Sequence, residues 1–65
     1  MTLPAGTRVE ATGEFARFLA EAGVSATGVV EASDIDDRDG IEYLTIRLDA
    51  GKYVMSTPAE NWRAQ

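Results

Sequence analysis

The sequence predicts a small, mainly β domain of about five short strands with one short helix. Residues 42–48 alternate between polar and apolar side chains, as expected for a strand with one buried face. Residues 49–51 (Asp-Ala-Gly) have the composition of a three-residue hairpin loop, in which the glycine takes a positive φ. Residues 14–22 instead place Phe15, Phe18 and Leu19 at helical spacing. Most of the chain is therefore expected to form strands, interrupted once by a helix.

The other elements follow in order along the chain. A short strand is expected at 7–11, before the helix. After the helix we expect a strand at 24–33 that bends at Gly28, an acidic connection at 33–40, strands at 42–48 and 52–57, a 3₁₀ turn at 57–61 and a short strand at 62–63. The expected core is Leu44, Ile46, Leu48, Val54, Val30 and Val9, closed at one end by Phe15, Phe18 or Leu19.

The hairpin loop also fixes which residues face each other across the two strands. A three-residue loop places Lys52 opposite Leu48 and Val54 opposite Ile46, with Val54 in the core. Alternation then sends Tyr53 and its neighbours on the same face away from the core. This outer face carries Tyr43, Thr45, Arg47, Tyr53 and Met55.

Four short segments carry a resemblance to a known group of folds. They are GTRV at 6–9, GVV at 28–30, LDAGKYV at 48–54 and PAENW at 58–62. With this order of elements, the chain resembles the SH3-like small barrels, which include SH3, Tudor-like and KOW-type domains. The resemblance implies one SH3-like domain over residues 1–65, folded as a small β-barrel or a strongly curled sheet, but it implies no particular ligand. The helix at 14–22 stands where an SH3 domain has the long loop that lines its peptide groove.

The composition excludes several kinds of site. The chain has 65 residues and contains neither histidine nor cysteine, so disulfides, thiolate-bound metals and the usual general base near neutral pH are absent. We therefore expect no enzyme activity, no cofactor and no metal site. No apolar run is long enough to cross a membrane, and the first residues lack the pattern of a signal peptide. A cytoplasmic protein, with no membrane partner, is expected.

The negative charge is concentrated in one connection. The net charge is −5, and residues 31–42 contain six acids and one base, whereas acids and bases cancel elsewhere. The connection carries Asp34, Asp36, Asp37 and Asp39. No register of these residues satisfies a calcium-binding EF-hand loop. Two interpretations remain open, a loop that keeps the protein soluble and a contact for a basic partner.

The outer face of the hairpin is the second candidate surface. Tyrosine, tryptophan and methionine are enriched where proteins bind each other. The candidate residues are Tyr43, Arg47, Tyr53 and Met55, with Ile41 on the same side and Trp62 flanking them. Two alternatives would hide this face: the helix could pack over it, or a symmetric homodimer could bury it.

These observations favour a non-catalytic protein-interaction module that uses the outer aromatic face, the acidic connection or both. The use of five arginines against one lysine, together with ten alanines, favours a bacterial or bacteriophage source. One alternative is a nucleic-acid-associated module of KOW or Tudor type, although only Arg47, Lys52 and Arg63 could surround the aromatic face with positive charge. Another is an inhibitor whose acidic connection imitates the phosphates of DNA.

Overall fold

The computed structural model describes residues 3–51 and 53–65, with the side chain of Met55 outside the description. The elements are β1 (Arg8–Ala11), α1 (Gly13–Glu21), β2 (Thr27–Ile35), β3 (Glu42–Leu48), β4 (Tyr53–Pro58), the 3₁₀ helix η1 (Ala59–Asn61) and β5 (Trp62–Ala64). Their order and types confirm the mainly β prediction with one helix. The largest difference is β2, which begins three residues later and ends two residues later than expected.

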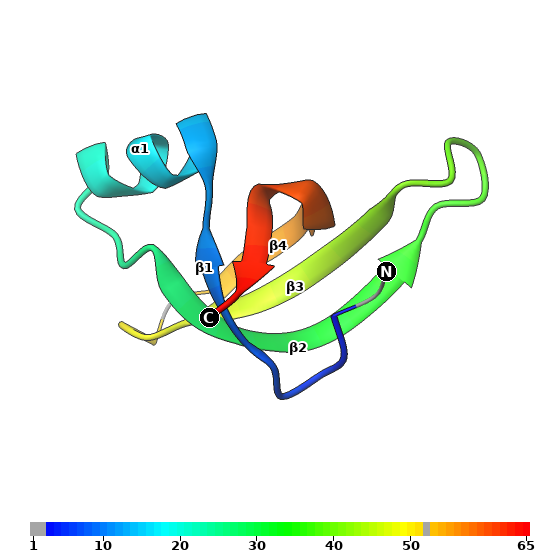
Figure 1. Cartoon of the computed structure of the whole chain (residues 1–65), viewed down its shortest axis with the longest axis horizontal. Coiled ribbons are helices and arrows are strands. Elements are labelled where there is room, and N and C mark those ends of the chain that lie inside the picture. Colours follow the sequence, from blue (N-terminus) through cyan, green and yellow to red (C-terminus); the bar gives the residue numbers. More distant parts are fainter. Residues whose placement is uncertain (1–2, 52) are drawn as a thin grey trace.

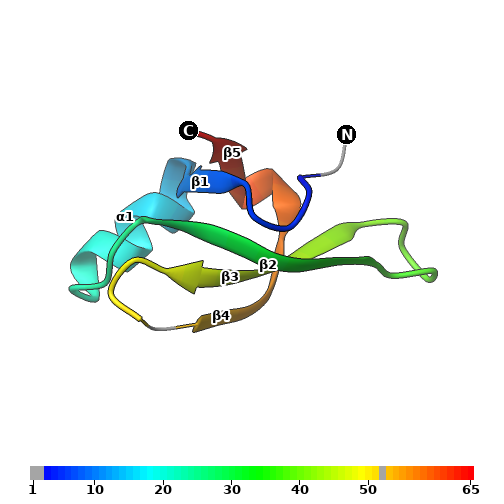
Figure 2. The same cartoon turned by 90° about the horizontal axis from the view of Figure 1, so that it is seen from below.

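All five strands belong to one antiparallel sheet in the order β4-β3-β2-β1-β5. The sheet curls, so that β1 and β5 lie on one side of β2 and the β3–β4 hairpin lies on the other (Figure 2). The 3₁₀ helix η1 carries the chain from the β4 edge to the β1 edge. Because β4 and β5 lie at opposite edges, the sheet of the described residues is not closed into a barrel, and of the two predicted forms the strongly curled sheet is the one observed.

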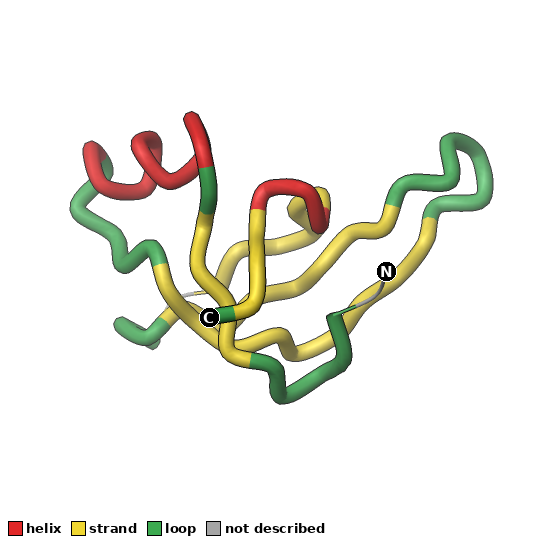
Figure 3. The backbone as a smooth tube through the Cα atoms, in the orientation of Figure 1, coloured by secondary structure: helices red, strands yellow, loops and turns green. Residues whose placement is uncertain are grey.

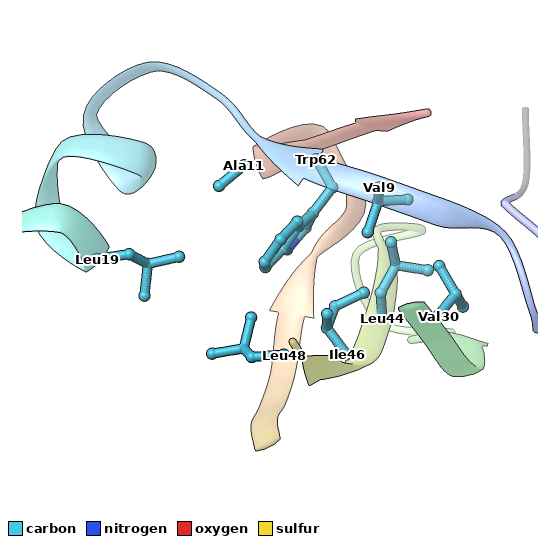
Figure 4. Close-up of a cluster of buried hydrophobic side chains, with 8 residues drawn as sticks. All are labelled: Val9, Ala11, Leu19, Val30, Leu44, Ile46, Leu48 and Trp62. Carbon is cyan, nitrogen blue, oxygen red and sulfur yellow. The ribbon is translucent and has the colours of Figure 1, made fainter. Parts of the chain in front are cut away.

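The core fills the concave side of the curled sheet (Figure 4). Its eight buried side chains are Val9, Ala11, Leu19, Val30, Leu44, Ile46, Leu48 and Trp62. Five of the six predicted strand residues are thus buried, and the sixth, Val54, is half-buried against them. Of the three candidates on the helix, Leu19 closes the core and Phe15 packs against it, whereas Phe18 is 63% exposed.

Trp62 was expected beside the outer aromatic face, and the structure places it in the core instead. Pairing of Ala11 with Trp62 between β1 and β5 brings the tryptophan to the inner side of the sheet, where its side chain is 4% exposed. The indole Nε1–H of Trp62 donates a hydrogen bond to the hydroxyl of Thr57 at 3.3 Å. The rings of Phe15 and Trp62 pack edge to face, with their centroids 5.5 Å apart. The tryptophan therefore holds the helix to the sheet.

The β3–β4 hairpin confirms the predicted register near its loop. Val54 lies opposite Ile46 and Tyr53 opposite Arg47, and Gly51 has a φ of +82°. The predicted pairing of Lys52 with Leu48 falls outside the described residues. Further along, a β-bulge adds one residue to β4, so that Thr57 rather than Ser56 lies opposite Leu44. Thr57 is buried as a result, and Ser56 takes a φ of +46°.

Strands β2 and β3 extend together beyond the rest of the molecule (Figures 1 and 3). We call residues 31–42 the acidic arm; it consists of the ends of these strands and the loop between them. Near the start of β2, Gly28 lies opposite Leu48 and so close to β3 that a Cβ atom would overlap the carbonyl oxygen of Arg47. A register shift follows between Val30 and Ala32. Where the sequence predicts a bend or bulge in β2, the structure thus has a close approach at Gly28 and a bulge after Val30.

Candidate functional site

The helix does not cover the outer face of the β3–β4 hairpin. Its main contacts are with β1 and η1, and its buried residue Leu19 belongs to the core on the concave side. Tyr53 is 57% exposed and Tyr43 is half-buried. The alternative in which the helix hides both tyrosines is therefore wrong. The outer face of the hairpin is open to solvent in this single chain.

The predicted site residues fall into two separate groups. Tyr43 lines an open hollow of about 580 Å³ together with the acidic arm. Its lining residues are Ala32, Ser33, Asp34, Ile35, Asp36, Asp37, Arg38, Tyr43, Thr45 and Ser56. Arg47 instead lines a second hollow, of about 220 Å³, near the hairpin loop, and Tyr53 lies opposite it on β4. The sequence predicted that Tyr43, Arg47 and Tyr53 share one aromatic surface. In the structure Tyr43 lines a hollow with the acidic residues, whereas Arg47 lines another hollow.

The register shift in β2 is what joins Tyr43 to the acids. Beyond the shift, Asp34 lies opposite Tyr43 and Ala32 opposite Thr45, so these residues share the outer face of the sheet. This arrangement could not be predicted, because residues 31–34 contain no alternating apolar pattern. Sequence patterns likewise did not indicate that Ala32, Thr45 and Ser56 line the hollow.

The loop of the acidic arm is held by its own side chains. Arg38 forms an ion pair with Asp36 at 3.1 Å, and the Arg38 backbone N–H donates to the same carboxylate at 2.9 Å. The Arg38 side chain and backbone together hold the pKa of Asp36 below its ordinary value. Gly40, with a φ of +71°, donates its N–H to the Asp36 carbonyl at 2.7 Å and closes the turn. The arm therefore has a defined shape.

Asp39 connects this loop to Tyr43. Its carboxylate accepts the Ile41 backbone N–H at 2.9 Å and the Tyr43 hydroxyl at 3.4 Å. The negative charge of Asp39 raises the pKa of Tyr43. Asp34, Asp37 and Asp39 form no ion pair with any described residue, and Arg38, the one base of the arm, is engaged with Asp36. The negative charge of the arm is consequently only partly compensated.

The second hollow is lined by charges that already have partners. Arg8 donates two hydrogen bonds to Asp49, at 2.8 and 3.0 Å, and Thr27 donates a third to the same carboxylate. These contacts lower the pKa of Asp49, with the Arg8 hydrogen bond as the largest cause. Arg47 lies 3.8 Å from Glu31. This group ties β1 and β2 to the hairpin loop, which is a structural role.

Comparisons of the chain with protein-family models, curated proteins and solved structures found no match. Within residues 3–51 and 53–65, no three acidic side chains come together closely enough to hold a metal ion. In the same part of the chain, no helix has the length and apolar character needed to cross a membrane. The acidic arm with Tyr43 is therefore the candidate site, and its geometry is the basis for assigning a function.

Proposed function

We propose that this chain is a non-catalytic protein-interaction module that binds a basic partner at the acidic arm and Tyr43. The observation that carries the proposal is that Tyr43 and the acidic residues line the same open hollow. Such a hollow offers an aromatic anchor beside uncompensated negative charge. Aromatic anchors supply much of the binding energy at protein interfaces, and charge complementarity steers the partner toward them.

Exposed apolar side chains on the arm give further support. Ile35 is 54% exposed and Ile41 is 41% exposed, and they lie at the two ends of the loop that the acids occupy. A loop that served only for solubility would gain nothing from exposed isoleucines. A partner that covers them would bury apolar area while its basic groups meet the carboxylates.

We also propose that the fold is an SH3-like sheet that stays open. The strand order, with the last strand returning beside the first, and the strong curl of the sheet support this proposal. Because such folds serve many unrelated functions, the fold alone names no partner.

Among the alternatives, an inhibitor that imitates DNA is supported by the projecting position of the acids (Figure 1). Its target would be the basic surface of a nucleic-acid-binding protein, which is one case of the basic partner proposed above. The KOW or Tudor type alternative is less well supported, because most of the charges around Tyr43 are acidic. The arginines nearby already face carboxylates: Arg38 pairs with Asp36, Arg8 with Asp49 and Arg47 with Glu31. A homodimer through the same surface would bring like charges together.

The proposal is tested with a short labelled peptide of alternating lysine and valine as the basic probe. Replacing Asp34, Asp37 and Asp39 by asparagine should slow association and reduce its dependence on salt, with dissociation little changed. The matched control replaces Glu14, Glu21 and Glu60 by glutamine. It makes the same change in net charge at exposed positions away from the arm. Equal loss of association in both triple variants would contradict a site on the arm.

Tyr43→Ser should mainly speed dissociation in the same assay, since it removes the anchor and leaves the charges that steer the peptide. Tyr53→Ser is the matched control, because Tyr53 is an exposed tyrosine on the outer face but lies away from the hollow. A larger effect of Tyr53→Ser would move the site to the hairpin loop.

A further inference from the structure

Among the described residues, no strand pairs with one edge of the acidic arm. Strand β1 pairs with β2 only as far as Val29, and the last hydrogen bonds on that side are Gly6 N–H to Val30 carbonyl, at 2.8 Å, and Val30 N–H to Thr7 carbonyl, at 3.0 Å. Beyond Val30, β2 continues to Ile35 with β3 on its other side alone. Figure 1 shows the two strands projecting together past the end of β1.

The ladder with β3 determines which backbone groups face this free edge. Asp36 donates its N–H to the Ile41 carbonyl at 3.0 Å, so this pair is hydrogen-bonded. Alternation along an antiparallel ladder then makes Asp34–Tyr43 a bonded pair and leaves Ser33 and Ile35 at non-bonded positions. The N–H and C=O groups of Ser33 and Ile35 therefore point away from β3, toward the side on which no described strand pairs with this part of β2. They can pair with one further strand.

The side chains along this edge specify which strand would fit. Asp34 shares the outer face with Tyr43, whereas alternation along the strand assigns Ile35 to the opposite face. Ile35 is 54% exposed and borders the rim of the hollow. A strand added beside β2 would place alternate side chains next to Asp34 and the others next to Ile35. Basic side chains suit the first set and apolar side chains the second.

We propose that the basic partner presents an extended segment of alternating basic and apolar residues, which adds to the free edge of β2 as a sixth strand. This inference rests on the proposed function and specifies how the same site binds. Main-chain hydrogen bonds to Ser33 and Ile35 supply affinity, and the acids and the hollow select basic side chains. Because the edge is flanked by carboxylates, an acidic segment or a second copy of the arm is repelled.

The test uses the alternating lysine–valine peptide in three forms: unmodified, methylated on the valine amides and methylated on the lysine amides. In an antiparallel arrangement the valine amides face β2, so their methylation should weaken binding by about tenfold or more, whereas lysine amide methylation should leave it unchanged. The opposite pattern would indicate a parallel strand and also supports the inference. Hydrogen exchange gives a second readout: the amides of Ser33 and Ile35 should slow on binding, with the Asp34 amide, already bonded to β3, as the internal reference.

Two outcomes separate this inference from the proposed function. If methylation of the valine amides and methylation of the lysine amides weaken binding equally, strand addition is wrong. The acidic site stands in that case as long as binding still requires the aspartates of the arm. If the lysine peptide binds no better than its glutamate counterpart, both are wrong. The protein could also dimerise in the absence of peptide, with slow amide hydrogen exchange at Ser33 and Ile35. This result would show that the edge pairs with a second copy, and it would overturn the inference.

Discussion

Asp49 joins three separate parts of the chain. It accepts two hydrogen bonds from Arg8 on β1 and one from Thr27 on β2, while it sits in the loop between β3 and β4. Arg8 and Asp49 are 41 residues apart, so no local pattern in the sequence indicates the pair. Both side chains are exposed, and solvent screening limits what the pair adds to stability.

A pH dependence follows from this contact. The pKa of Asp49 is lowered from its ordinary 3.8 in the folded chain, as is that of Asp36 beside Arg38. A carboxylate with a lowered folded-state pKa adds stability above its unfolded pKa and loses it as the pH falls through the folded value. The melting temperature should therefore fall as the pH decreases below about 4. In thermal melts across this pH range, the melting temperature of Asp49→Asn should fall less steeply with decreasing pH than that of the parent.

The partner variant supplies the control for the pH prediction. Arg8→Gln should make the melting temperature less dependent on pH below about 4, as Asp49→Asn does. The double variant should show little additional change, because both substitutions remove the same interaction. If the three variants lose stability with pH in parallel with the parent, the Arg8–Asp49 contact does not exist in solution.

Among the elements, the helix is held to the sheet through few side chains. Leu19 is buried, Phe15 meets Trp62, and Phe18 stacks on Phe15 at 6.3 Å while remaining mostly exposed. A helix of nine residues is too short to persist alone, so these contacts determine whether it forms.

Two phenylalanine variants test this packing. Phe15→Ala should cost about 1–3 kcal/mol of unfolding free energy, since it removes a half-buried ring and its contact with Trp62. Phe18→Ala should stay within about 0.5 kcal/mol, as expected for an exposed position. Urea denaturation measures both. Equal losses, or a larger loss for Phe18, would mean that the helix presents a different face to the sheet.

The elements also show where sequence reasoning succeeded and where it failed. Regular alternation in β3 predicted both the buried residues and the pairing of Ile46 with Val54, because one strongly patterned strand fixes the register of its neighbour. The bulges beside Ala32 in β2 and at Ser56 in β4 could not be predicted. Each adds one residue to one strand of a pair, and no change in composition marks the position of that residue. Trp62 was misplaced because a three-residue strand has too little pattern to show its inner face.

At the scale of the whole molecule, the core and the excess charge occupy different regions. The core lies between the curled strands, and the acidic arm projects from it along the longest dimension, 33 Å (Figures 1 and 4). Because the buried side chains do not extend into the loop of the arm, the charges there can be changed with little effect on the fold. Binding and stability should therefore be separable by mutation.

We propose that the acidic arm and Tyr43 form the binding site of this molecule. The most direct test is a titration of the labelled protein with the lysine–valine peptide, followed by backbone amide NMR signals. We expect shifts at residues 31–43 and at Thr45 and Ser56, with the signals of Arg47 and Tyr53 unchanged. Shifts centred on Arg47 and Tyr53, or none on the arm at saturating peptide, would contradict the claim.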